Sequence, residues 1–175
     1  MINEEFAEID LSEQIDNPWT KDTAIAIIKG KTSFSVKINA KDKNDLKKFF
    51  RKSGKTRNIK RHNRRGVVII YSFLLYHLLK ISNGLSDKIK VCNDMGHSRG
   101  VNEYLTKICR YYREFPIQEK INLSFKKRKK KKSKAHQIAK EVAHGRKPAN
   151  ITLVKPHIDK IKEILKLNLN LSKKV

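Results

Sequence analysis

The sequence predicts an α/β fold: a mixed sheet with an N-terminal antiparallel hairpin, then alternating helices and strands, and a basic helix at the C-terminus. Three observations support this prediction. Short β-branched runs alternate with segments whose apolar residues recur at helical spacing. Two strand-like runs are separated by two residues, as in a hairpin. One long apolar segment has the composition of a buried helix.

The predicted hairpin lies near the start of the chain. Residues Ala24–Lys29 (AIAIIK) and Thr32–Ile38 (TSFSVKI) have the composition of strands, and a Gly-Lys pair links them. A short helix is expected over Lys43–Arg51 (KNDLKKFFR). The segment Arg51–Arg65 that follows is strongly basic and is predicted to be loop-like.

The most apolar segment is Gly66–Ile81 (GVVIIYSFLLYHLLKI), and it predicts a central helix buried on nearly every side. A membrane-spanning helix needs about 20 apolar residues. This run is shorter, contains Ser72 and His77, and is closed by Lys80. We therefore expect no membrane insertion.

The second half of the chain repeats strand and helix. Strands separated by helices are usually parallel, so the whole sheet is expected to be mixed. Gly145, with a proline shortly after it, ends one of the predicted helices. The predicted elements are strands at Lys88–Cys92 and Ile121–Phe125 and helices at Gly100–Tyr112, Ser133–His144 and His157–Leu167.

Charge is the strongest functional signal. The 175 residues include 41 Lys and Arg against 17 Asp and Glu, a net charge of +24. Residues 1–22 oppose this trend, and we expect them to form a peripheral acidic leader. Residues 23–146 are expected to form a single α/β domain, and residues 147–175 a linker and a basic amphipathic helix. Such an excess of positive charge favours a nucleic-acid backbone or an anionic membrane surface as the partner.

Two basic clusters predict contacts with phosphates. One has eight bases between Arg51 and Arg65, and the other has eight bases in the nine residues Lys126–Lys134. A glycine-rich turn with Arg99, between a strand and a helix, offers backbone N–H groups to a phosphate or is an ordinary helix entry. The predicted nucleic-acid-binding residues are Arg51, Lys52, Lys55, Arg57, Lys60, Arg61, Arg64, Arg65, Arg99, Lys126, Lys127, Arg128, Lys129, Lys130, Lys131, Lys132 and Lys134.

Cysteine and histidine give little support to a metal or disulfide framework. Cys92 and Cys109 lie far apart in the chain, and the six histidines have no ligand spacing. An intracellular, cytoplasmic location is expected, because sparse, unpaired cysteines are typical of reducing compartments.

Between Ala24 and His144 the order of elements resembles the ribonuclease H-like fold, in particular its nuclease and resolvase branches. In that family three antiparallel strands precede helix, strand, helix, strand and helix. The stretch KIKVCNDMG resembles the fourth strand of the family, which ends at an acidic residue. The stretch SKAHQIAKEVAHG resembles its last helix, which brings Asp, Glu or His to the metals.

This resemblance implies a centre for Mg²⁺ or Mn²⁺ with Asp94 as the fourth-strand carboxylate and metal ligand, and His136 or Glu141 as the last-helix residue. The usual first-strand carboxylate is missing, since Lys29 stands where the acid is expected and Asp22 precedes the strand. A third antiparallel strand is also not found between residues 38 and 66. From the residues alone, Asp94 equally suits a turn, Glu141 a surface ion pair and His136 a border or capping position.

Two functions from different classes follow. The first is a nucleic-acid-binding protein on a ribonuclease H-like scaffold without catalysis, acting on RNA or DNA, as an RNA-binding or ribosome-associated protein in contact with ribosomal RNA would. This function requires no cofactor. The second is a divalent-metal-dependent endonuclease or resolvase acting on structured nucleic acid. Membrane-surface binding by the C-terminal helix is a weaker third class, because that helix lacks Trp and Phe anchors.

Overall fold

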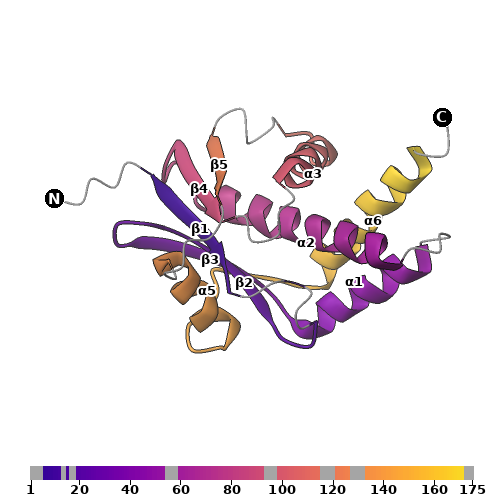
Figure 1. Cartoon of the computed structure of the whole chain (residues 1–175), viewed down its shortest axis with the longest axis horizontal. Coiled ribbons are helices and arrows are strands. Elements are labelled where there is room, and N and C mark those ends of the chain that lie inside the picture. The colour runs from indigo at the N-terminus through magenta and orange to yellow at the C-terminus, as the bar shows by residue number, and fades with distance from the viewer. Residues whose placement is uncertain are drawn as a thin grey trace.

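A computed structural model of the chain describes residues 6–12, 15, 19–53, 59–92, 98–114, 121–126 and 133–171, with the backbone alone at 52–53, 59–63 and 168–171. Within these ranges a six-stranded mixed sheet has helices on both faces (Figure 1). The predicted α/β class and mixed sheet are confirmed.

The sheet is built from an antiparallel meander extended by parallel strands on both sides. The meander consists of β1 (Ala7–Leu11), β2 (Thr23–Lys29) and β3 (Thr32–Ile38). Strand β4 (Lys88–Cys92) is parallel to β1, β5 (Asn122–Lys126) is parallel to β4, and β6 (Ile151–Leu153) is parallel to β3. The order across the sheet is β5-β4-β1-β2-β3-β6.

Strand β1 corrects the expected acidic leader. It lies between β4 and β2 in the middle of the sheet, so residues 7–11 belong to the folded core. Ile15 and Trp19 are buried as well. The side chain of Lys43, itself fully buried, donates to the Ile15 carbonyl at 2.9 Å and to Thr23 Oγ1 at 2.8 Å. The third antiparallel strand therefore precedes the predicted hairpin instead of following it.

Five helices are described: α1 (Ala40–Ser53), α2 (Ile59–Ile81), α3 (Ser98–Tyr111), α5 (Lys134–Ala143) and α6 (Lys155–Leu171). The prediction of a loop over Arg51–Arg65 is wrong where it overlaps α1 and α2. Lysine and arginine are good helix formers, so a basic segment can continue a helix without apolar residues. The short strand β6 was not predicted, because three residues carry almost no periodic signal.

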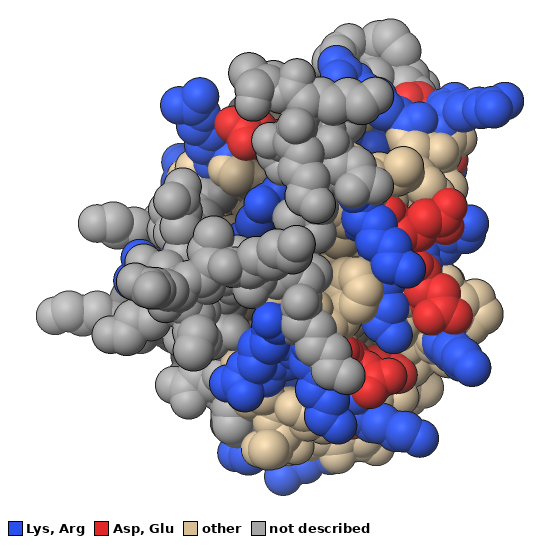
Figure 2. Space-filling model, turned by 90° about the vertical axis from the view of Figure 1, so that its right-hand side faces the viewer, with Lys and Arg blue, Asp and Glu red and all other residues tan. Residues whose placement is uncertain are grey.

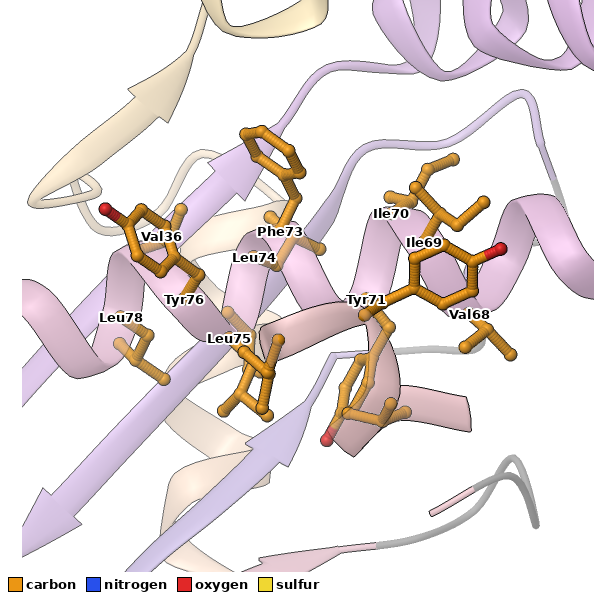
Figure 3. Close-up of a cluster of buried hydrophobic side chains, with 14 of the residues drawn as sticks. Val36, Val68, Ile69, Ile70, Tyr71, Phe73, Leu74, Leu75, Tyr76 and Leu78 are labelled. Atoms are coloured by element: carbon orange, nitrogen blue, oxygen red, sulfur yellow. The ribbon is translucent and has the colours of Figure 1, made fainter. Parts of the chain in front are cut away.

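Helix α2 packs its apolar residues against one face of the sheet (Figure 3). Phe73, Leu74 and Leu75 are fully buried there, together with Ile25 and Ile27 of β2. The predicted burial of this helix is confirmed. Among the described helices, none is long and apolar enough to cross a membrane.

The opposite face of the sheet is covered by α5, which contacts β1, β2 and β3. Side chains alternate along a strand, so Ala24 and Ala26 point away from the face that Ile25 and Ile27 occupy. These alanines are fully buried, as are Ala135 and Ala139 of α5. Small residues on both sides bring the helix backbone close to the sheet.

Candidate nucleic-acid interface

The strand register aligns side chains from five strands on the face that α5 covers. Asp10 of β1 pairs with Ala26, which pairs with Ser35, and on the other side Cys92 pairs with Lys126. Ile9 pairs with Val91, so continuing that register by one residue places Cys92 beside Asp10. Neighbouring strands are about 4.8 Å apart, which puts the backbone of Lys126 about 10 Å from that of Asp10.

Three polar side chains meet where this row passes beneath the start of α5. Asp10 is 2% exposed, and its Oδ2 accepts a hydrogen bond from Ser133 Oγ at 2.9 Å. Ser133 is also the N-cap of α5, because its Oγ accepts from the His136 backbone N–H at 3.0 Å. The His136 ring is buried and lies with Nδ1 2.7 Å from the Leu11 carbonyl oxygen. We call Asp10, Ser133 and His136 the polar cluster.

The contact with Leu11 determines the tautomer of His136. A carbonyl oxygen only accepts hydrogen bonds, so Nδ1 must carry the proton. The lone pair of a neutral imidazole then lies on Nε2, the atom that acts as acceptor or metal ligand. His136 therefore lies three residues after the N-cap Ser133, with Nδ1 directed at β1 and Nε2 as its other ring nitrogen.

The two other predicted catalytic residues do not join the polar cluster in the described structure. Glu141 is exposed. Each helical residue turns by 100°, so Glu141 lies about 140° around the axis of α5 from His136. Asp94 lies outside the described residues.

The first strand does carry a carboxylate, which corrects the expectation that it lacked one. That expectation took Ala24–Lys29 as the first strand, whereas Asp10 is in β1. Asp22, the expected substitute, caps α1 by accepting from the Ala40 backbone N–H at 2.9 Å, and it pairs with Lys37 at 2.7 Å. Burial would raise the pKa of Asp22, but these hydrogen bonds outweigh burial and hold the pKa below its usual value.

A second set of side chains forms a basic surface beside the polar cluster. Because α5 packs on β1, β2 and β3, the same face of β4 and β5 continues past the helix (Figure 1). Lys88 and Lys90 of β4 and Lys126 of β5 project from it, and Lys134 follows the N-cap of α5. Lys88, Lys126 and Lys134 are exposed, whereas Lys90 is half-buried and paired in register with Glu8. We call these four lysines the lysine platform.

Sequence reasoning missed Asp10, Lys88 and Lys90. A signal for each was present. In AEIDL, apolar and acidic residues alternate as in a strand, and in KIKVC both lysines fall on one face while Ile89 and Val91 fall on the other. The net acidity of residues 1–22 concealed the first pattern.

The predicted nucleic-acid-binding residues divide by what the structure describes. The side chains of Arg51, Arg64, Arg65, Arg99, Lys126 and Lys134 are exposed. Arg65 Nε donates to Tyr104 Oη at 2.7 Å, which joins the second turns of α2 and α3. Only the backbone is described for Lys52, Lys60 and Arg61. Outside the described residues lie Lys55, Arg57, Lys127, Arg128, Lys129, Lys130, Lys131 and Lys132.

Positive charge is spread widely over the surface. On the face in Figure 2, lysine and arginine appear from top to bottom, and most of the aspartate and glutamate lies on the right-hand half. Within the described part of the chain, no group of three or more His, Cys, Asp or Glu side chains gathers in a way that could hold a metal ion. The polar cluster contains two side chains of these types, Asp10 and His136.

Comparisons with known proteins identify no relative of this chain. No protein-family model, no curated protein and no solved structure matches the chain.

Proposed function

We propose that this chain is a nucleic-acid-binding protein on a ribonuclease H-like scaffold, and that it holds phosphate backbones without requiring catalysis. An RNA-binding or ribosome-associated protein fits this description. The observation that carries the proposal is the lysine platform: Lys88, Lys126 and Lys134 project from one region of the sheet and the adjoining helix end, among +24 of net charge. One of the two basic clusters predicted from the sequence, Lys126–Lys134, begins and ends at lysines of that region.

The order of elements supports the scaffold part of the proposal. Three antiparallel strands are followed by helical residues, then strand, helix, strand and helix, ending at α5. With β1 as the first strand, this follows the order that the sequence resemblance implies, except that two helices, α1 and α2, stand where that order has one. Strand β6 and helix α6 follow as an addition at the β3 edge.

Electrostatics explains what the platform would do. Lysines held on a strand keep their spacing, and each one that neutralises a phosphate releases condensed counterions. The binding free energy then depends steeply on salt and weakly on base sequence, because phosphate contacts carry no sequence information.

A metal-dependent endonuclease is a second candidate, which one specific observation favours. Asp10 and His136 come together from the first strand and the last helix, and Asp94 follows β4 by two residues in the sequence. Mg²⁺ and Mn²⁺ favour several oxygen ligands. The described residues offer one carboxylate and one imidazole, which is not a complete set for either ion. Binding without cleavage is therefore the better supported function.

A charge-matched pair of variants tests the proposal. We expect the triple variant Lys88→Gln, Lys126→Gln and Lys134→Gln to weaken binding of labelled duplex and to lower the slope of log affinity against log salt by about 3. The control variant Lys31→Gln, Lys41→Gln and Lys155→Gln removes equal charge from exposed positions elsewhere. Equal losses from the two variants, or no binding by the unmodified chain, would contradict the proposal. Parallel incubations with Mg²⁺, Mn²⁺ or EDTA report cleavage.

A further inference from the structure

The C-terminal end of α3 carries two arginines and two tyrosines in a row. It reads Arg110-Tyr111-Tyr112-Arg113. The Arg113 backbone N–H donates to the Arg110 carbonyl at 3.0 Å, and the Glu114 N–H donates to the Cys109 carbonyl at 2.8 Å. These bonds close the helix with Arg113 in the left-handed region, at φ 56°. Glycine usually occupies this position, because any other residue pays a conformational cost of about 1 kcal/mol there.

The backbone hydrogen bonds that close the helix, that from the Glu114 N–H to the Cys109 carbonyl among them, compensate the conformational cost at Arg113. Arg113 and Arg110 are exposed, and neither makes an ion pair with the described residues. Both guanidinium groups are therefore available to a ligand at the surface.

The two tyrosines between the arginines are held rigidly. Tyr112 stacks on Tyr76, with ring centroids 5.3 Å apart and planes at 4°. Tyr111 meets the Tyr112 ring edge-on at 5.2 Å, and its hydroxyl accepts from Lys160 Nζ at 2.9 Å. Both Tyr111 and Tyr112 remain partly exposed. Rings fixed in this way lose little side-chain entropy when a planar group packs on them.

Local charge at this helix end is positive. Its two nearby acids are already paired: Glu114 accepts from Tyr76 Oη at 2.8 Å and Lys80 Nζ at 2.7 Å, and Glu163 pairs with Lys160 at 3.2 Å. The charges of Arg110 and Arg113 are not offset by comparable pairs in the described chain. Arginines and tyrosines at one helix end supply the two kinds of contact that proteins use for unpaired nucleotides, with bases stacked on rings and phosphates bound by guanidinium groups.

We propose that Arg110, Tyr111, Tyr112 and Arg113 form a second nucleic-acid contact that takes unpaired nucleotides. This inference rests on the proposed nucleic-acid-binding function and extends it to single-stranded segments. A duplex hides the faces of its bases, so it can offer this site phosphates alone. The chain then has one surface for backbones and one for exposed bases.

The test compares two double variants. Arg110→Gln with Arg113→Gly removes two charges and places glycine at the left-handed position, so we expect thermal stability to be kept or raised. We expect affinity for a single-stranded oligonucleotide to fall about tenfold and affinity for a duplex to fall less than twofold. Arg146→Gln with Lys147→Gln removes two exposed charges after α5 and is expected to weaken both ligands slightly and equally.

A stacking signal separates base contact from charge. An oligonucleotide containing 2-aminopurine should lose fluorescence on binding, and Tyr111→Leu should restore most of it while the duplex still binds. Equal effects of the two double variants, or duplex binding without single-strand binding, would overturn this inference alone. Failure to bind any nucleic acid would overturn the proposed function as well.

Discussion

The two faces of the sheet are built from different side chains and serve different purposes. On the α2 face, large residues such as Phe73 and Ile27 fill the space between helix and sheet. On the α5 face, Ala26 and Ala139 bring the helix close, and the row of side chains next to Ala26 includes the buried Asp10. Large apolar groups contribute most of the burial free energy. The α2 face therefore contributes most of the stability of the fold. The α5 face contributes less apolar burial and positions polar groups instead.

The largest effect is expected on the α2 face. Phe73→Ala should lower the free energy of unfolding by about 3–5 kcal/mol, because it removes a fully buried ring and leaves a cavity. Chemical denaturation measures this loss. A decrease of less than about 1 kcal/mol would show that the α2 face does not dominate stability.

The same helix carries a pH-dependent contribution. Burial, with smaller effects of His157 and Lys80, lowers the pKa of His77 from 6.5 to about 4. The unfolded chain takes up this proton near pH 6.5 and the folded chain near pH 4, so stability falls as pH drops through this window. The loss is at most about 3 kcal/mol.

Replacing the imidazole isolates that contribution. The variant His77→Phe keeps an aromatic ring beside Phe73 and Tyr76 and removes the titrating group. Its unfolding free energy, measured between pH 7 and pH 4, should depend less on pH than that of the unmodified chain. Identical pH profiles would rule out His77 as the source.

A smaller loss is expected from overfilling the α5 face. Ala139→Leu inserts a larger side chain where a fully buried alanine faces the sheet, and it should cost about 1–3 kcal/mol of unfolding free energy. Ala143→Leu is a matched control, because Ala143 lies on the same helix and is only partly buried. Equal losses of unfolding free energy in the two variants would show that close packing of α5 on the sheet does not limit the size of residue 139.

The smallest stability effect is expected at the polar cluster. Asp10→Asn keeps the shape of the side chain and an acceptor oxygen, so it should change the unfolding free energy by less than about 1 kcal/mol and leave duplex affinity intact. Any Mg²⁺-dependent cleavage by the unmodified chain should disappear in this variant. Cleavage that survives Asp10→Asn would exclude Asp10 from a nuclease centre.

Local signals account for most of what the sequence could predict. The helix over Ser133–His144 was predicted with its glycine stop, and the structure has α5 with Gly145 at φ 72° after it and Ser133 as the N-cap. These features depend on neighbouring residues alone. Helix α2 was equally clear because its apolar run is long.

The missed features depend on partners distant in the chain. Strand β1 has five residues, and its place in the sheet is fixed by pairing with β2 and with β4, which lies about eighty residues later. The acidic composition of residues 1–22 indicates an exposed leader, and this concealed the position of Asp10 on a central strand. Lys88 and Lys90 lie on a face of β4 that α5 does not cover, because α5 packs on β1, β2 and β3. The position of a helix on a sheet cannot be predicted from the residues of one strand.

The most direct test of the central claim is a salt titration of duplex binding by the unmodified chain and by the variant with Lys88, Lys126 and Lys134 changed to glutamine. We predict that affinity falls steeply with salt and that the variant reduces the slope of log affinity against log salt by about 3. An affinity that does not depend on salt, or a slope that the variant leaves unchanged, would contradict the assignment of this face to nucleic-acid binding.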